Sequence, residues 1–336
     1  MAANHHGREW YDRAAEPIID PDRPIIDTHF HFFTGFGHDY LAEQLLEDVG
    51  HGHNVVGMVH VEANADFFKN GGAPGEMRFA AEQGARMRAM QAGRARICDP
   101  VAGIVGYADL RAPDLGGQLD ALAAAAEGRL RGIRNSSAWD AAPDVRNGHT
   151  NPPQGLLADP AFIAGLRQLA GRGLVFDSYA YHPQIGEQVA LARAVPEAVI
   201  VCDHLCGLIG VGPYKGRVEE AFDVWKADLA ALAACPNVVI KLGGMAMSVS
   251  GWNWHKRDSA LRSEEYASHY ARWFRTAIET FGPDRCMYES NFPVDGVSIS
   301  YNNLWNAFKV ISDIYSDEEK DRLFFNTASR VYRLGY

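Results

Sequence analysis

Two histidines, two residues apart, end the first apolar run of the chain. Ile25 and Ile26 lead through Asp27 to His29 and His31. Residues two apart in a β-strand point to the same face, roughly 6–7 Å from each other along the strand. The pair can therefore share one metal ion or one substrate, and the same alternation predicts that Asp27 faces their side, one pleat deeper. Two neutral imidazoles that converge at a strand end are typical of a hydrolytic metal site.

Short apolar runs and amphipathic stretches alternate along the rest of the chain. Such alternation implies parallel strands joined by crossover helices, and eight units imply a closed (β/α)8 TIM barrel. The expected strands are 25–30, 55–61, 101–107, 130–134, 174–178, 198–202, 238–242 and 286–289. The expected helices are 39–49, 75–91, 115–127, 160–170, 185–194, 219–234, 264–281 and 302–314, with a closing helix near 317–325. Residues 1–24 are predicted to be an N-terminal extension, and residues 25–336 one barrel domain.

Polar residues stand at nearly every expected strand end. The active site of a TIM barrel lies at the C-terminal ends of its strands, so these side chains are expected to face one mouth. After the first strand they are His60, Glu62, Tyr107, Asp109, Arg134, Asn135, Asp177, Tyr179, His182, Asp203, His204, Lys241, Glu289, Ser290 and Asn291.

Several of these residues have a structural interpretation beside the functional one. Arg134 is either an ion-pair partner or the fork that binds a substrate carboxylate. Lys241 could be an amine nucleophile, although a structural salt bridge is favoured. Cys202 and Cys206 flank His204, but no second cysteine pair completes a structural zinc site, so packed thiols are expected.

Composition narrows the classes of partner. The chain has 32 lysines and arginines against 42 aspartates and glutamates, and a formal charge of −10. Because the chain has no block of basic residues, nucleic acid and anionic membranes are not expected as partners. A small-molecule substrate is expected instead. A homo-oligomer is possible. No signal peptide or membrane-spanning run is seen. Five irregularly spaced cysteines are typical of reduced thiols, which predicts a cytoplasmic protein.

Four ordered motifs together resemble the amidohydrolase superfamily. They are Asp27-Thr-His29-Phe-His31, Tyr181-His182-Pro183-Gln184, Asp203-His204-Leu205-Cys206-Gly207 and Glu289-Ser290-Asn291-Phe292-Pro293. The similarity is greatest to the amidohydrolase-2 branch, and within it to hydrolases of sugar lactones, muconolactones and pyrone dicarboxylates. The closing segment 325–332 is also similar to the C-terminal helix of that family.

The resemblance implies a deformed (β/α)8 barrel and a particular ligand set. His29 and His31 would bind metal with His182, near His204 and a strand-eight aspartate that binds metal and takes a proton from water. Members with two metals carry a carboxylated lysine or a glutamate at the end of strand four. Because Arg134 ends that strand here, at most one ion, with zinc favoured, is expected.

Asn291 stands where the family has its strand-eight aspartate. A neutral amide cannot accept a proton near neutral pH, and it is a poorer metal ligand than a carboxylate. Three interpretations stay open: a metal site with another base, a metal-free site, or a protein that is not a hydrolase. The candidate bases are His204, Glu289 and Asp295. His204 ranks first because the ordinary pKa of histidine, ~6.5, suits general-base work.

The leading hypothesis is hydrolysis of a small carboxylated lactone. His204, Glu289 and Asn291 are the expected catalytic residues. The substrate is expected to contact Arg134, Tyr179, Lys241, Tyr107 and Trp254, the last in an insert over the mouth. Non-oxidative decarboxylation of an aromatic or ene-carboxylic acid is the alternative, and a non-catalytic binding barrel is the second alternative.

Overall fold

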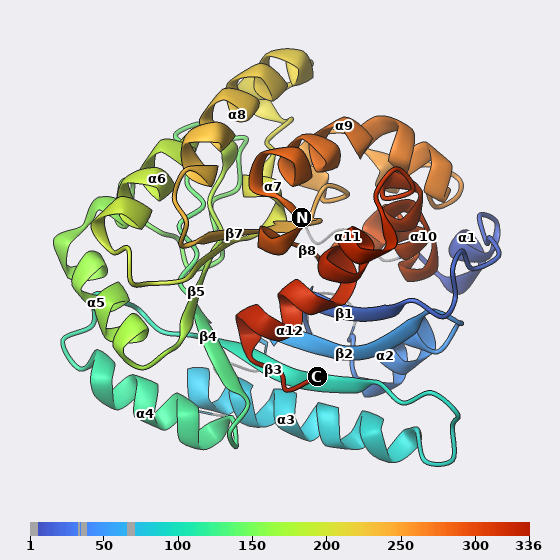
Figure 1. The fold of residues 1–336 in the computed structure, drawn as a ribbon, viewed down its shortest axis with the longest axis horizontal. Helices are drawn as coiled ribbons and strands as arrows, with labels where there is room; N and C mark the ends of the chain where they lie inside the picture. The colour runs from blue at the N-terminus through green and yellow to red at the C-terminus, as the bar shows by residue number, and fades with distance from the viewer. Residues whose placement is uncertain (1–5, 33, 35–38, 66–70) are drawn as a thin grey trace.

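Eight parallel strands form one barrel-shaped sheet in a computed structural model that describes residues 6–32, 34, 39–65 and 71–336. Their spatial order is their order in the chain (Figure 1). The strands are β1 Pro24–Phe30, β2 Asn54–Val61, β3 Asp99–Tyr107, β4 Leu130–Arg134, β5 Val175–Ser178, β6 Ile200–Cys202, β7 Val238–Leu242 and β8 Cys286–Tyr288. The ring closes where the segment after β8 meets β1, through hydrogen bonds from Asn291 N to His29 O and from His31 N to Phe292 O. The predicted TIM barrel is confirmed.

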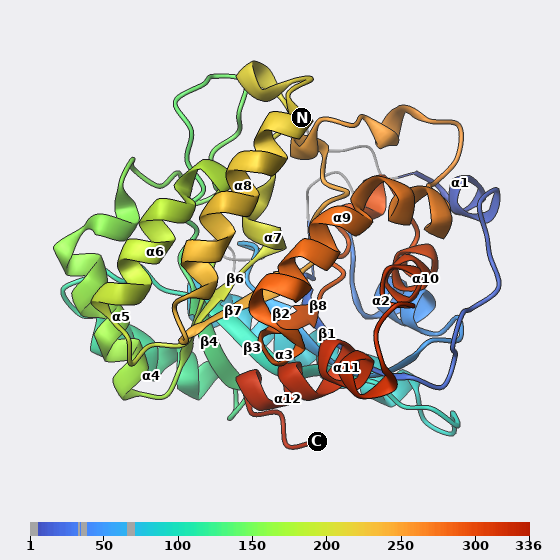
Figure 2. The same ribbon diagram turned by 45° about the horizontal axis from the view of Figure 1, so that its top comes forward.

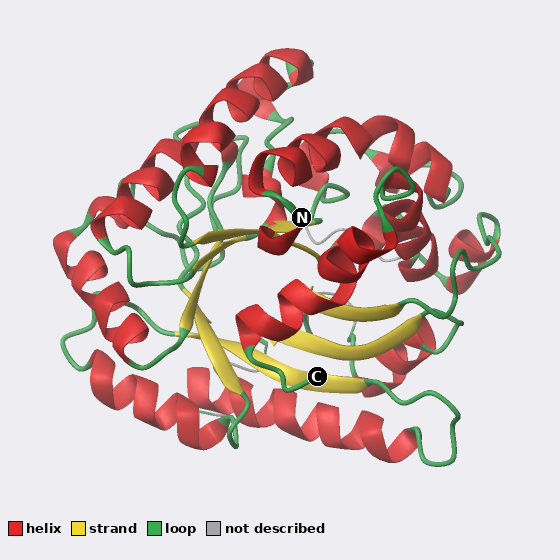
Figure 3. Ribbon diagram, viewed as in Figure 1, coloured by secondary structure: helices red, strands yellow, loops and turns green. Residues whose placement is uncertain are grey.

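Helices surround the sheet on the outside (Figure 2 and Figure 3). They are α1 Arg8–Asp12, α2 Ala42–Val49, α3 Ala73–Met90, α4 Leu115–Ala125, α5 Pro160–Gly171, α6 Ile185–Ala194, α7 His204–Gly207, α8 Val218–Ala233, α9 Ser263–Phe281, α10 Tyr301–Ile311, α11 Asp317–Asp321 and α12 Thr327–Tyr332. A π-helical turn, Arg322–Asn326, joins α11 to α12 without a break, so the predicted closing helix near 317–325 is present and continues to Tyr332. Within the described residues, no helix has both the length and the apolar character needed to cross a membrane.

The N-terminal half of the barrel interior is apolar and closed. Valines from β2, β3, β5, β6 and β7 meet Ile26 and Met287 there, and α12 packs against them with Ala328, Val331 and Tyr332. In Figure 1 this helix, drawn in red, lies across the near end of the barrel, and in Figure 2 it lies at the bottom of the view beside the C-terminus. Polar chemistry is therefore confined to the opposite end, where the strands terminate.

The side chain of Asp27 does not share the face of His29 and His31. Ile26 occupies the barrel interior, so Asp27 points outward, where its Oδ2 accepts a hydrogen bond from Tyr301 of α10 (3.0 Å). The register of β1 against β2 shifts between Asp27 and Phe30, and this irregularity returns His29 to the interior. The expectation of simple alternation was wrong at this point because it did not allow for a bulge.

Glu76 of α3 holds the loop that follows β2 and supplies a test of the packing. Its Oε1 accepts hydrogen bonds from the backbone N–H groups of Ala63 (2.8 Å) and Ala65 (2.9 Å). Its other oxygen is buried without a hydrogen-bond partner among the described residues. Burial, with a smaller contribution from the charge of Glu62, raises the pKa of Glu76 to about 8. Folding therefore favours the protonated form of this carboxyl group.

We expect Glu76→Gln to stabilise the protein at alkaline pH. Between the ordinary pKa of 4.5 and about 8, the unfolded chain releases a proton that the folded chain keeps, so wild-type stability falls as pH rises. Glutamine keeps the acceptor for both N–H groups and cannot ionise. Urea unfolding should measure the difference in unfolding free energy between Glu76→Gln and wild type. This difference should be at least ~2 kcal/mol more favourable to the variant at pH 8.5 than at pH 5. An equal difference at both pH values would contradict the raised pKa.

Candidate functional site

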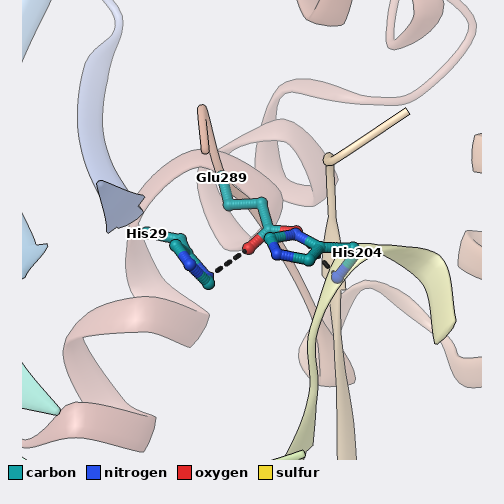
Figure 4. A group of neighbouring side chains, drawn as sticks. All are labelled: His29, His204 and Glu289. Atoms are coloured by element: carbon teal, nitrogen blue, oxygen red, sulfur yellow. Dashed lines mark hydrogen bonds and ion pairs between the residues drawn. The ribbon is translucent and has the colours of Figure 1, made fainter. Parts of the chain in front are cut away.

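The carboxylate of Glu289 lies between the imidazoles of His29 and His204 at the C-terminal end of the barrel (Figure 4). Its Oε2 is 2.9 Å from His29 Nδ1, and its Oε1 is 2.7 Å from His204 Nδ1. All three side chains are at most 3% exposed. One potential ligand atom from each lies within 4.8 Å of the other two. Sequence reasoning named all three residues but did not group them.

A strained turn after β6 places His204. His204, Leu205 and Cys206 have φ values of 58°, 50° and 62°, in the left-handed region that costs non-glycine residues energy. Two contacts compensate: Glu289 Oε1 accepts the backbone N–H of His204 (2.8 Å), and Trp225 donates to Leu205 O (2.8 Å). Such strain persists only where the surroundings hold it, which fits a turn that presents a functional side chain.

His29 and His31 converge as the sequence predicted. Their Nε2 atoms are 3.1 Å apart. His31 Nδ1 lies 2.7 Å from Val61 O, a contact that requires a proton on Nδ1 and leaves Nε2 to face its neighbour. Arg134 Nη1 approaches the same point, 3.2 Å from His29 Nε2.

Two buried cations are already paired with protein carboxylates. Lys241 Nζ lies 2.7 Å from Asp177 and 3.0 Å from Asp203. Arg134 Nε lies 2.7 Å from Glu62 Oε1, and Nη1 is 3.5 Å from Asp203. The favoured interpretation of Lys241 as a salt-bridge residue agrees with this geometry. Arg134 is an ion-pair partner, which was one of its two predicted roles. A substrate carboxylate could bind Arg134 only by displacing Glu62 or Asp203.

The site carries more negative than positive charge. Burial opposes ionisation of Glu289, but the charges of His204 and His29 outweigh it and lower the pKa of Glu289 to about 2. Burial also opposes ionisation of Asp203, yet Lys241 and His29 hold its pKa well below the usual range. Counting only carboxylate, lysine and arginine side chains, the four carboxylates of Glu62, Asp177, Asp203 and Glu289 exceed the two paired cations by two.

The group of His29, His204 and Glu289 fits a single divalent ion. Two imidazole nitrogens and one carboxylate oxygen form the three-ligand set of many catalytic zinc sites, and a double positive charge would balance the excess. His182, predicted as a ligand, lies outside this group. Its Nδ1 accepts a hydrogen bond from Ile209 N (3.3 Å), and its ring packs on Tyr214.

The predicted substrate-binding aromatic residues occupy different places. The Tyr179 ring lies 5.2 Å from the His204 ring, and Tyr107 is paired in register with Arg134 on the adjacent strand. Trp254 instead packs against His269 and donates a hydrogen bond to Tyr270 of α9 (3.1 Å). The predicted position of Trp254 over the mouth has no support in these contacts, because the insert folds back onto the outer helix.

The side-chain amide of Asn291 is hydrogen-bonded to the carboxylate of Asp295. Its Nδ2 donates to Asp295 Oδ1 (2.9 Å), and Asp295 Oδ2 accepts from Ala246 N (3.2 Å). Burial raises the pKa of Asp295 to about 7. The acidic groups near this strand end are therefore Glu289 and Asp295, on either side of the neutral residue.

His149 is a candidate functional residue that sequence reasoning missed. It lies in the long loop between β4 and α5, and its Nε2 is 2.9 Å from Glu62 Oε2. No apolar run leads into it, so a search of strand ends could not find it. The length of the loop at the barrel mouth was the available signal, because long loops in compact domains often carry function.

Comparisons with known proteins identify the family of this chain. The family model described as "Amidohydrolase" matches residues 26–334. The chain belongs to the amidohydrolase family. It is 31% identical to the uncharacterized protein y4mH of Sinorhizobium fredii, over 93% of this chain and 99% of that protein. It is 28% identical to an L-fucono-1,5-lactonase of Burkholderia multivorans, over 92% and 96% of the two chains.

Solved structures of amidohydrolases share the fold. A crystal structure of an amidohydrolase from Burkholderia multivorans, solved with bound zinc, aligns with a TM-score of 0.66 and 24% identity. The alignment covers 92% of this amidohydrolase and 99% of the other chain. The expectation of an amidohydrolase-type enzyme is thus confirmed at the level of family and fold.

A charge exchange between Asn291 and Asp295 tests their pairing. Asn291→Asp places two carboxylates where a 2.9 Å hydrogen bond now lies, so we expect a loss of ~1–3 kcal/mol in unfolding free energy at pH 8. Adding Asp295→Asn should recover most of it, because the amide introduced there can donate to the new carboxylate and accept from Ala246. Urea unfolding of both variants checks this. A single variant as stable as the double one would show that the residues are not coupled.

Proposed function

We propose that the protein hydrolyses a small lactone by opening its ring ester. The observation that carries this proposal is the buried Glu289 carboxylate between two imidazoles at the catalytic end of an amidohydrolase barrel. The relationship to an L-fucono-1,5-lactonase over nearly the whole chain supports a lactone as substrate. An L-rhamnono-gamma-lactonase of Scheffersomyces stipitis, 23% identical over 60% of this chain, has the same class of activity.

His29, His204 and Glu289 would hold one divalent ion, with zinc favoured, which when bound polarises the lactone carbonyl and makes water more acidic. The excess of negative charge favours this form. In a metal-free form the same residues would act on water directly. Glu289 Oε1 accepts the Nδ1–H of His204, and His204 Nε2 takes the proton that the attacking water loses. Glu289 then stabilises the imidazolium.

The site favours a neutral, hydroxylated lactone over the carboxylated one expected from the sequence. Recognition of a substrate carboxylate needs a free cation, but Arg134 and Lys241 are each bound by two protein carboxylates. Two polar groups are suited to substrate hydroxyls: Tyr179, whose ring lies 5.2 Å from that of His204, and Tyr107, which is in register with Arg134. Hydrogen bonds to hydroxyls are the means by which such a site would select a sugar-type lactone.

A panel of lactones tests the proposal. Neutral sugar lactones should be opened, and lactones bearing a carboxylate should be poorer substrates, as measured by acid release with a pH indicator. His204→Ala should lower kcat/KM by ~10²-fold or more, because it removes a group that contacts the reacting water or its metal. The absence of turnover of every lactone, with or without added Zn²⁺ or Mn²⁺, would reject the proposal.

Metal content can be measured independently of activity. Elemental analysis of protein purified without chelator should find about one equivalent of a divalent metal, with zinc favoured, per chain. Glu289→Gln should lower that content, since it removes the anionic ligand. The matched substitution Glu265→Gln, in a surface ion pair with Arg257, should leave it unchanged. Full activity in metal-free protein would instead favour the metal-free form.

A further inference from the structure

His149 is the member of the charged network at the barrel mouth that reaches solvent. Its side chain is 22% exposed, whereas that of Glu62 is fully buried and that of Arg134 nearly so. Hydrogen bonds on both sides fix its place: Gly148 N donates to Ala138 O (2.7 Å), and Thr150 Oγ1 donates to Ser136 O (3.2 Å). The loop therefore presents this imidazole in a defined position.

Glu62 sets the orientation of the His149 ring. Burial opposes ionisation of Glu62, but the charges of His149 and Arg134 lower its pKa to about 2. An ionised carboxylate only accepts hydrogen bonds, so the 2.9 Å contact requires that His149 Nε2 donates. The other ring nitrogen, Nδ1, has no hydrogen-bond partner in the described part of the chain, and it is free to contact a ligand.

The same carboxylate connects His149 to the reaction centre. Glu62 Oε1 holds Arg134 Nε at 2.7 Å, and Arg134 Nη1 lies 3.2 Å from His29 Nε2. His149 and the group of His29, His204 and Glu289 thus lie on opposite sides of one guanidinium. The carbonyl oxygen and the ring oxygen of a lactone are bonded to the same carbon atom, so a lactone bound here would turn one oxygen toward His29 and the other toward His149.

We propose that His149 is the catalytic acid that protonates the ring oxygen as it leaves. The inference rests on the proposed lactone hydrolysis. The water oxygen bonds to the carbonyl carbon, and the bond from that carbon to the ring oxygen breaks. The proton lost by the water passes to His204 and from there to solvent, and one proton is released per turnover once the product acid has ionised. In this step the imidazolium form of His149 gives its Nδ1 proton to the departing oxygen, which becomes a hydroxyl group, and keeps the Nε2 proton that Glu62 accepts. The neutral ring then takes a proton from solvent, which its exposure permits.

The need for such an acid depends on the leaving group, and this makes the proposal testable. An alkoxide leaves poorly without a proton, whereas a thiolate is stable enough to leave unaided. His149→Gln and His149→Ala should therefore lower kcat for a lactone by ~10²-fold or more. With the thiolactone of the same ring, the loss should stay within ~5-fold of wild type. Added imidazole should restore lactone turnover to His149→Ala.

His51→Gln is the matched control. His51 is an exposed histidine that contacts Arg8 outside the site, and its substitution should change neither rate. Thermal unfolding of each variant verifies that it is folded. If His149→Ala fails to fold, the losses in kcat with lactone and with thiolactone are compared for His149→Gln alone.

Each remaining outcome overturns the proposal. An equal loss with lactone and thiolactone would make His149 a positioning residue that acts through Glu62, and no loss would remove it from the reaction. In both cases wild-type lactone turnover would still stand. If wild type opens no lactone at all, the proposed function fails, and this inference fails with it.

Discussion

The contact of one carboxylate with two histidines organises the catalytic end of this barrel. Glu289 binds the ring of His29 on β1, and both the ring and the backbone N–H of His204 after β6. It thereby joins three strands and holds a turn of left-handed residues that would otherwise relax. A buried carboxylate can persist only with such partners, since an unpaired charge in the interior is very costly. Structure and chemistry here depend on the same group.

Most of the positive charge in the site serves the protein itself. Lys241 and Arg134 are deep in the barrel, where each neutralises carboxylates that burial would otherwise destabilise. This arrangement preorganises the field around His29 before any substrate arrives. It also shows why an arginine at a barrel mouth is an ambiguous sign: its partners, rather than its position in a strand, decide whether it is available to a ligand.

The fold was predictable because it follows from local patterns. Each expected strand agrees with the structure to within two residues, since eight short apolar runs separated by amphipathic helices permit few other arrangements. The convergence of His29 and His31 was predicted correctly, although an irregularity in β1 rather than simple alternation places His29. Three features could not be read from pattern: the bulge that turns Asp27 outward, the folding of the Trp254 insert onto α9, and the approach of His149 to Glu62. Each depends on contacts between segments far apart in the chain.

The last helix ties the end of the chain to the catalytic charges. The Tyr332 hydroxyl of α12 donates to Asp177 Oδ2 (2.8 Å), the same oxygen that holds Lys241. The helix that closes the N-terminal end of the barrel is thus hydrogen-bonded to the ion-pair network at the catalytic end. During synthesis, strands β1 to β8 leave the ribosome before α12 does, so the N-terminal end of the barrel interior stays uncovered until α12 has been made. The reaction centre of this amidohydrolase therefore becomes complete only after α12 has been made.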